Sequence, residues 1–188
     1  LPFDANFVIM DADDQISIVR RILKELNIDE KLYNPASIHN QISNAKNALI
    51  ALESFTSRSY REEVVKRVFE RYEQVLRESN AVDFDDLLMW AVRLFDENAD
   101  IREAYSRRFE HVLVDEFQDT NLAQYELLKH LSSFHHSLFL VGDEDQSIYR
   151  WRGADYRNVL RFQSDYPQAV KLLLEQNYRS TQNVLNAA

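Results

Sequence analysis

The stretch HVLVDEFQDTN, running from His111 to Asn121, places three apolar residues directly before a polar cluster that contains three carboxylates. A short apolar run that no turn signal interrupts is typical of a buried strand. In open parallel sheets, ligands bind beyond the carboxyl ends of the strands, which is where Asp115 and Glu116 fall. Two interpretations stay open at this point. The carboxylates solvate the end of a strand, or they hold a metal ion and prepare a water molecule for attack.

Two more apolar runs follow and predict the fold class. They are SLFLVG at 137–142 and VKLLLE at 170–175, and segments with helical periodicity separate the three runs. Strands that alternate with helices in this way are the signature of a parallel sheet with crossover helices. Residues 1 to about 80 are mostly helical in pattern after one short opening strand, NFVIMD. The prediction is an α/β protein in which a helical unit precedes part of a parallel sheet.

Composition restricts the classes of function. The chain has 188 residues, a formal net charge of −9 and no cysteine. The lack of cysteine excludes disulfides and thiolate metal sites, and we therefore expect a reducing compartment, the cytoplasm. No apolar run approaches the length that spans a bilayer, so no membrane partner is expected. Because the chain begins at Leu1 without methionine and ends on a helix-like STQNVLNAA, we expect a piece of a longer protein.

A local basic segment follows the second apolar run. Between Tyr149 and Arg161 there are four arginines and a single aspartate, with aromatic residues interleaved. Aromatic faces stack on bases and arginines contact phosphates, so this segment is a candidate for binding single-stranded nucleic acid. The alternative is that Trp151 and Tyr156 are core residues and that the arginines pair with nearby acids.

Two further positions suit a nucleotide. Gln146 follows the second run and can hydrogen-bond a terminal phosphate without adding charge. After the third run, in EQNYRS, Tyr178 offers a flat face for a purine and Arg179 offers a planar fork for phosphate. The alternative for EQNYRS is an ordinary junction between a strand and a helix.

Three segments together resemble a known family. VDEFQDTN, LVGDEDQSIYRWRGA and LEQNYRST, in this order and spacing, resemble motifs II, III and IV of superfamily 1 DNA helicases of the UvrD/Rep/PcrA group. QISNAKNALI and AVDFDDLL also resemble that group's sequence before motif II. The resemblance implies an internal fragment of an ATP-dependent 3′-to-5′ DNA helicase. It divides the chain into a helical inserted subdomain (1–80), a partial first RecA-like, P-loop NTPase domain (81–175) and the start of a second RecA-like domain (176–188).

The resemblance also implies a role for each candidate residue, with ATP, Mg²⁺ and single-stranded DNA as ligands. Asp115 would coordinate the Mg²⁺ of Mg-ATP, and Glu116 would activate the hydrolytic water. The other roles are a γ-phosphate contact for Gln146 and Arg179, adenine stacking for Tyr178, and contact with single-stranded DNA for Tyr149, Trp151 and Arg152.

The phosphate-binding motif of that family, G-x-x-x-x-G-K-[ST], does not occur in this sequence. The only glycines, Gly142 and Gly153, are eleven positions apart and neither precedes a lysine. We therefore expect these 188 residues to hydrolyse no ATP by themselves. Two alternatives to a helicase motor stay open. One is a non-catalytic DNA-binding or interaction module on the same scaffold, and the other is the motor of a helicase–nuclease subunit.

Overall fold

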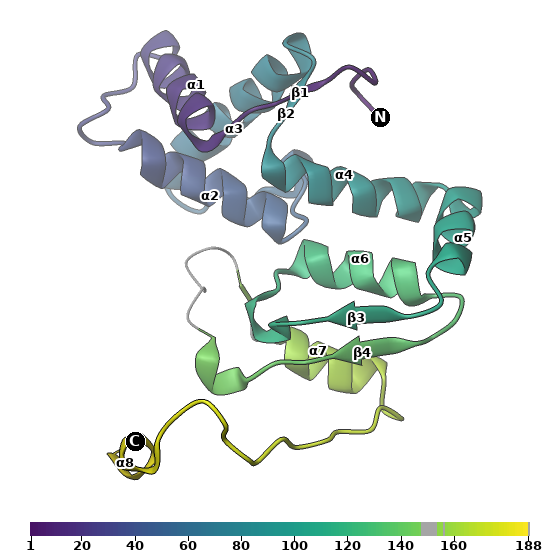
Figure 1. Cartoon of the computed structure of the whole chain (residues 1–188). Coiled ribbons are helices and arrows are strands. Elements are labelled where there is room, and N and C mark those ends of the chain that lie inside the picture. The colour runs from purple at the N-terminus through teal and green to yellow at the C-terminus, as the bar shows by residue number, and fades with distance from the viewer. Residues whose placement is uncertain (148–153, 156, 188) are drawn as a thin grey trace.

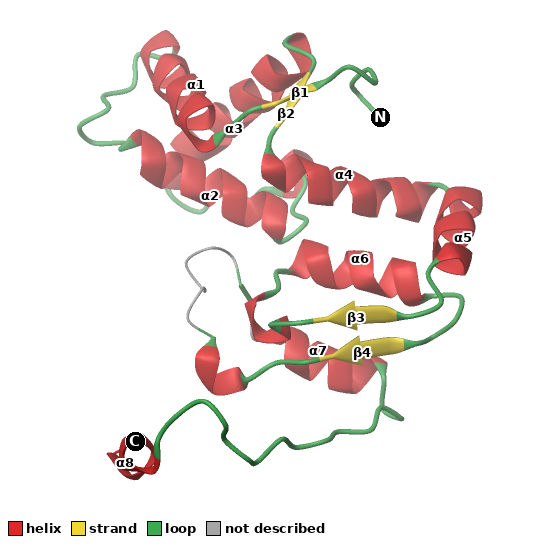
Figure 2. Ribbon diagram, viewed as in Figure 1, coloured by secondary structure: helices red, strands yellow, loops and turns green. Residues whose placement is uncertain are grey.

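The structure is a computed structural model that describes residues 1–147, 154–155 and 157–187. A helical unit with a small sheet comes first, and a second unit carries another small sheet with helices around it (Figure 1). Figure 2 shows that helices make up most of the regular structure. None of the described helices is long and apolar enough to cross a membrane.

Three helices form the first unit: α1 (Ala12–Glu25), α2 (Pro35–Asn47) and α3 (Tyr60–Glu78). Each begins where a side chain accepts hydrogen bonds from the first turn, which satisfies otherwise unpaired N–H groups. These capping residues are Asp11, Asn34 and Ser59. The apolar faces of the three helices meet in one core, which includes the fully buried side chains of Val19, Ile22, Leu23, Ile38, Val65 and Val68. A 3₁₀ turn, η1 (Leu52–Ser54), joins α2 to α3.

A short parallel sheet closes this unit. The opening strand is confirmed as β1 (Val8–Ile9), and it pairs with β2 (Ala81–Val82), with Val8 opposite Ala81. The chain therefore returns to its beginning directly after α3. From β2 it continues into α4 (Phe84–Glu97) and α5 (Ala99–Arg108), and α4 packs against both α2 and α6 (Leu122–Ser132).

The second unit contains the two strands that the sequence predicts around the acidic cluster. β3 (Val112–Val114) and β4 (Leu138–Leu140) are parallel, and Leu113 lies opposite Phe139. α6 is the crossover helix between them and contacts β3, while α7 (Arg157–Asp165) follows β4 (Figure 1). The structure is thus mixed α/β with short parallel sheets, as predicted, and it is consistent with a partial RecA-like domain.

The third predicted strand, at 170–175, is wrong. These residues have no regular structure and belong to an extended segment that leads to the terminal helix α8 (Gln182–Ala187). The side chains of Val170, Leu172 and Leu174 are 83%, 75% and 89% exposed. A strand is stable when a neighbouring strand satisfies its backbone groups, and neither β3 nor β4 pairs with this segment. The apolar pattern was present, but the hydrogen-bonding neighbour was not.

A buried lysine joins the elements of the first unit. The ammonium of Lys46, on α2, is fully buried and lies 2.8 Å from Glu73, 2.8 Å from Asp83 and 2.7 Å from Asp86. Its three N–H groups thus face three carboxylates. The hydroxyl of Tyr72 donates to the same oxygen of Asp83 at 3.0 Å. We call these five residues the Lys46 cluster.

The Lys46 cluster also begins helix α4. Asp83 is the N-cap of α4 and accepts the backbone N–H of Asp86, while the side chain of Asp86 accepts the backbone N–H of Asp83. This is a capping box whose remaining carboxylate oxygens are turned to Lys46. The burial of Lys46 acts to lower its pKa, but the neighbouring carboxylates outweigh burial and raise the pKa, so the ammonium stays charged.

Replacing Lys46 tests the cluster's contribution to stability. In Lys46→Met the three carboxylates lose their cation while they stay buried, and removing one partner of a buried ion pair typically destabilises by about 3–5 kcal/mol. We expect a loss of that size in the free energy of unfolding from urea titration. Lys24→Met, at an exposed position of α1, is the control and should change stability by less than about 0.5 kcal/mol. Equal stabilities of the two variants would contradict this account.

The cluster also predicts a pH dependence. Burial raises the pKa of Asp86 to about 7, and the like charges of Asp83 and Glu73 add to this effect against the opposing attraction of Lys46. The folded chain then keeps a proton that the unfolded chain releases near the ordinary aspartate pKa of about 3.9. Between these two pH values Asp86 holds more protons in the folded state than in the unfolded state, so its contribution to the free energy of unfolding falls as the pH rises.

Asp86→Asn, which cannot titrate, provides the comparison. The stability of the unsubstituted chain relative to Asp86→Asn should decrease steadily between about pH 4 and pH 7, measured by urea unfolding at several pH values. If the stability of the unsubstituted chain relative to Asp86→Asn instead increased with pH over this interval, the pKa of Asp86 would be lowered in the folded state.

Candidate functional site

The site is built on the carboxyl ends of β3 and β4. Asp115 and Glu116 follow β3 directly and both are exposed. Glu116 adopts the left-handed conformation, with φ 51° and ψ 42°, which is uncommon for a residue other than glycine. Its backbone N–H donates to Asp115 Oδ1 at 2.9 Å. The chain therefore turns sharply at the end of the strand and enters the 3₁₀ turn η2 (Phe117–Asp119).

Gln118, the middle residue of η2, connects the ends of β3 and β4 through hydrogen bonds. Its side chain is 1% exposed. Its amide Nε2 donates to Glu116 Oε2 at 2.7 Å, and its Oε1 accepts the backbone N–H of Asp143 at 3.0 Å. The polar cluster after β3 is thus held directly against the loop after β4.

Gly142 makes this approach possible. A Cβ atom at this position would lie 2.7 Å from Gln118 Oε1 and 3.3 Å from the backbone nitrogens of Phe117 and Gln118. The first distance is closer than side chains tolerate, and the other two involve main chain. The backbone N–H of Phe117 also donates to the carbonyl of Val141 at 2.9 Å. A larger residue here would therefore have to displace the Gln118 side chain and press on the backbone of η2.

Gln146 reaches the same site through Asp143. Gln146 belongs to the 3₁₀ turn η3 (Glu144–Gln146), and its Nε2 donates to Asp143 Oδ2 at 2.6 Å. Three of the residues that the sequence singles out, Asp115, Glu116 and Gln146, are therefore brought to one edge of the β3–β4 pair. The intermediates, Gln118 and Asp143, were not predicted. Their positions inside DEFQDTN and GDED are the signal that points to them.

The other side of η2 is anchored by buried amides. Asn158, fully buried on α7, donates to the carbonyls of Thr120 and Asn121, both at 3.0 Å. The backbone N–H of Asp155 donates to the carbonyl of Thr120 at 2.9 Å. Asn121, the N-cap of α6, donates through Nδ2 to Asn47 Oδ1 at the end of α2. The segment after Glu116 is thus joined to both the helical unit and α7.

The predicted basic segment is described only in part. Tyr149, Trp151, Arg152 and Tyr156 lie outside the described residues. Arg157 and Arg161 form ion pairs with Asp155 at 2.7 and 2.8 Å, as the alternative interpretation predicts for the arginines. Partial burial acts to raise the pKa of Asp155, but the hydrogen bonds from the two arginines outweigh it and lower the pKa to about 2.

Tyr178 and Arg179 stand apart from these residues. Both are exposed on the extended segment before α8, and Tyr178 is 93% exposed. The backbone N–H of Arg179 donates to Asn177 Oδ1 at 2.9 Å. Among the described residues, no hydrogen bond or ion pair joins either side chain to Asp115, Glu116 or Gln146. Their predicted roles at a nucleotide stay predictions.

The carboxylates at the strand ends suit a magnesium ion whose remaining ligands come from water and from the phosphates of a bound nucleotide. Within the described part of the chain, no group of three or more acidic, histidine or cysteine side chains is arranged to hold a metal ion. Mg²⁺ at nucleotide sites usually has one or two carboxylate ligands, and water and substrate phosphates supply the others. Asp115 has one oxygen engaged with the N–H of Glu116 and the other available for such a contact.

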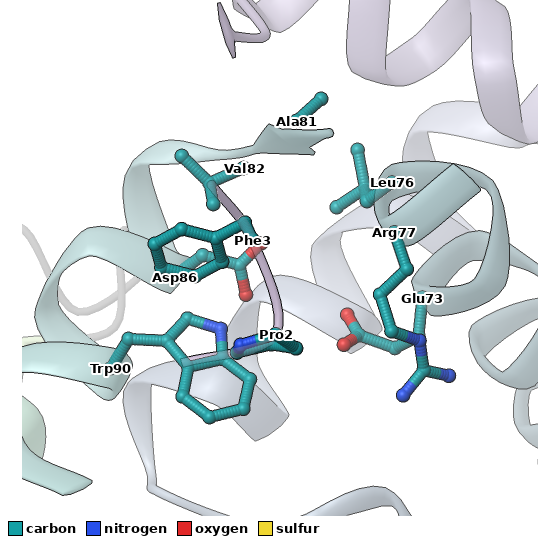
Figure 3. A pocket seen from close by; sticks show the side chains of 9 residues that line it. All are labelled: Pro2, Phe3, Glu73, Leu76, Arg77, Ala81, Val82, Asp86 and Trp90. Atoms are coloured by element: carbon teal, nitrogen blue, oxygen red, sulfur yellow. The ribbon is translucent and has the colours of Figure 1, made fainter. Parts of the chain in front are cut away.

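A small pocket lies elsewhere, in the helical unit (Figure 3). Pro2, Phe3 and Trp90 lie on one side of it, and the carboxylates of Glu73 and Asp86 border it. Its volume of about 10 Å³ is roughly what one water molecule needs. It therefore suits hydration of the Lys46 cluster rather than a substrate.

Comparison with known proteins agrees with this geometry. Residues 2–167 match the model of the UvrD/REP helicase N-terminal domain. The chain is 49% identical over 185 residues to the ATP-dependent DNA helicase PcrA of Bacillus subtilis, covering 97% of this chain and 25% of that protein. It is 46% identical over 187 residues to PcrA of Staphylococcus aureus strain Mu50, covering 98% of this chain and 26% of the relative. The chain thus spans about a quarter of the length of these relatives. The match over residues 2–167 and the identity to these relatives place the chain in the UvrD/REP helicase family.

Proposed function

We propose that this chain is part of an ATP-dependent DNA helicase that moves 3′-to-5′ on single-stranded DNA. The observation that supports it best is the meeting of Asp115, Glu116 and Gln146 at one edge of two parallel strands, in a chain of the UvrD/REP family. Two relatives that match nearly the whole chain are named ATP-dependent DNA helicases. The location we propose is the cytoplasm.

The chemistry that we assign to the site is hydrolysis of the terminal phosphate of ATP. Asp115 would hold Mg²⁺, which supplies charge neutralisation at the phosphates when bound. Glu116 accepts a proton from the attacking water, as a general base. Gln146 hydrogen-bonds the terminal phosphate without adding charge to the metal site. Their shared position after the carboxyl ends of β3 and β4 supports this division of roles.

The proposal also assigns contacts with single-stranded DNA and with the rest of the nucleotide. Tyr149, Trp151 and Arg152 contact single-stranded DNA, with Trp151 stacking on a base. Tyr178 stacks on the adenine and Arg179 contacts the γ-phosphate, and their exposure leaves both side chains available to a ligand. Residues 1–80 form the helical inserted subdomain, 81–175 part of the first RecA-like domain, and 176–188 the start of the second.

The first test concerns the general base. In the full-length helicase that carries these residues, Glu116→Gln should lower the kcat of DNA-stimulated ATP hydrolysis by about 100-fold or more, because an amide cannot accept the proton. Glu110→Gln, an exposed position just before β3, is the matched control and should keep full turnover. The 188 residues alone, which lack the phosphate-binding motif, should show no turnover. Wild-type turnover in Glu116→Gln would refute the assignment.

The second test concerns DNA. Trp151→Ala should weaken binding of a labelled single-stranded oligonucleotide by about 5- to 150-fold at fixed salt, since loss of one stacked base is worth about 1–3 kcal/mol. Each single arginine-to-alanine change between 149 and 161 should weaken it less. Binding constants that fall equally for Trp151→Ala and the arginine variants would argue against stacking.

A further inference from the structure

The amide of Gln118 has a defined orientation at the proposed site. The backbone N–H of Asp143 is a donor, so the atom that faces it at 3.0 Å must be the acceptor Oε1. The Nε2 group then necessarily faces Glu116, where it donates to Oε2 at 2.7 Å. If the amide were flipped, Gln118 Nε2 would face the backbone N–H of Asp143, and two donors would oppose each other. The main chain of the loop after β4 therefore determines which group Gln118 presents to Glu116.

This amide also has little freedom to leave. Gln118 is 1% exposed, and a hydrogen bond in such an environment is not exchanged readily for one to water. Gly142 lies so close that even a methyl group there would come within 2.7 Å of Gln118 Oε1. The exposed carboxylate of Glu116 is thus held by a rigid, buried neighbour.

The contacts continue to Gln146. Asp143, whose N–H meets Gln118, accepts a hydrogen bond from Gln146 Nε2 on its carboxylate at 2.6 Å. A continuous series therefore runs from Glu116 through Gln118 and Asp143 to Gln146. It crosses from the end of β3 to the end of β4, between the two residues assigned to the water and to the terminal phosphate.

We propose that Gln118 is a positioning residue for hydrolysis, which holds Oε2 of Glu116 so that Oε1 faces the attacking water and which links Glu116 through Asp143 to Gln146. This inference rests on the proposed function. The water transfers a proton to Glu116 as its oxygen bonds to the terminal phosphorus. The bond from phosphorus to the bridging oxygen breaks, and its electron pair stays on the departing diphosphate. Gln118 itself neither gains nor loses a proton.

The test uses the full-length helicase and its DNA-stimulated hydrolysis of Mg-ATP. Gln118→Met keeps the volume and removes both hydrogen bonds. We expect kcat to fall about 10- to 100-fold, the size of effect that misplacing a reacting group produces. The KM for ATP should stay within about twofold, because Gln118 is not assigned a contact with the nucleotide. Affinity for single-stranded DNA should also be unchanged.

Gln15→Met is the matched control. Gln15 is 5% exposed in the helical unit, where it donates to the carbonyl of Met10 at 2.8 Å and hydrogen-bonds His39 at 2.6 Å. Its replacement removes another buried amide and should lower the melting temperature while kcat stays at the wild-type value. If Gln118→Met and Gln15→Met lowered kcat equally, Gln118 would be merely structural.

Two more variants separate positioning from folding and test the link. Gln118→Asn keeps an amide at this buried position but is one methylene too short to reach both Glu116 and Asp143, so it should lose kcat about as strongly as Gln118→Met. Asp143→Ala breaks the connection to Gln146. In a double-mutant cycle, Gln118→Met combined with Asp143→Ala should be little slower than the slower single variant. Normal kcat in Gln118→Asn, or multiplicative effects in the cycle, would overturn the proposal.

The outcomes also distinguish this inference from the proposed function. Turnover that survives Glu116→Gln would refute the assignment of the base, and with it the inference. Turnover that is lost in Glu116→Gln but normal in Gln118→Met would leave the proposed function intact and refute only the role of Gln118.

Discussion

The contact between the Lys46 ammonium and its carboxylates organises the helical part of this chain. It joins the end of α2 to α3 through Glu73 and to the first turn of α4 through Asp83 and Asp86. A buried charge without partners is strongly unfavourable, so these elements must meet in one arrangement if Lys46 is to be buried at all. The next residue, Asn47, then extends the same connection toward the second unit.

That extension shows how the two units are joined. The Asn47 amide donates to Asp85 at 3.0 Å on α4, and its oxygen accepts from Asn121 at the start of α6. Asn121 lies at the end of the segment that begins with Glu116, so the polar contacts that orient the helices reach the acidic strand end. Buried amide contacts of this kind have directional requirements that apolar packing lacks, and they define how α2 meets α6.

The short segment after β3 has two roles in this arrangement. On one side Gln118 holds Glu116 against the loop after β4. On the other, the carbonyl of Thr120 accepts hydrogen bonds from Asp155 and Asn158, and the hydroxyl of Ser147 lies 3.4 Å from the carbonyl of Gln118. Residues on both sides of the segment proposed to contact DNA are therefore attached to the segment that carries the proposed general base. A displacement of the segment proposed to contact DNA can therefore be transmitted through these hydrogen bonds to the segment that carries Glu116.

Local patterns in the sequence determined much of this protein. The strand before Asp115 and the parallel β3–β4 pair were predictable because hydrophobic periodicity acts over a few residues. The apolar run at 170–175 failed as a strand because strand formation depends on a neighbour, which a local pattern does not specify. The partners of Lys46, and the use of Gln118 to orient Glu116, depend on segments far apart in the chain. Only the tertiary structure could decide them, since hydrogen bonds and ion pairs are selected by which groups the packed backbone brings within about 3 Å.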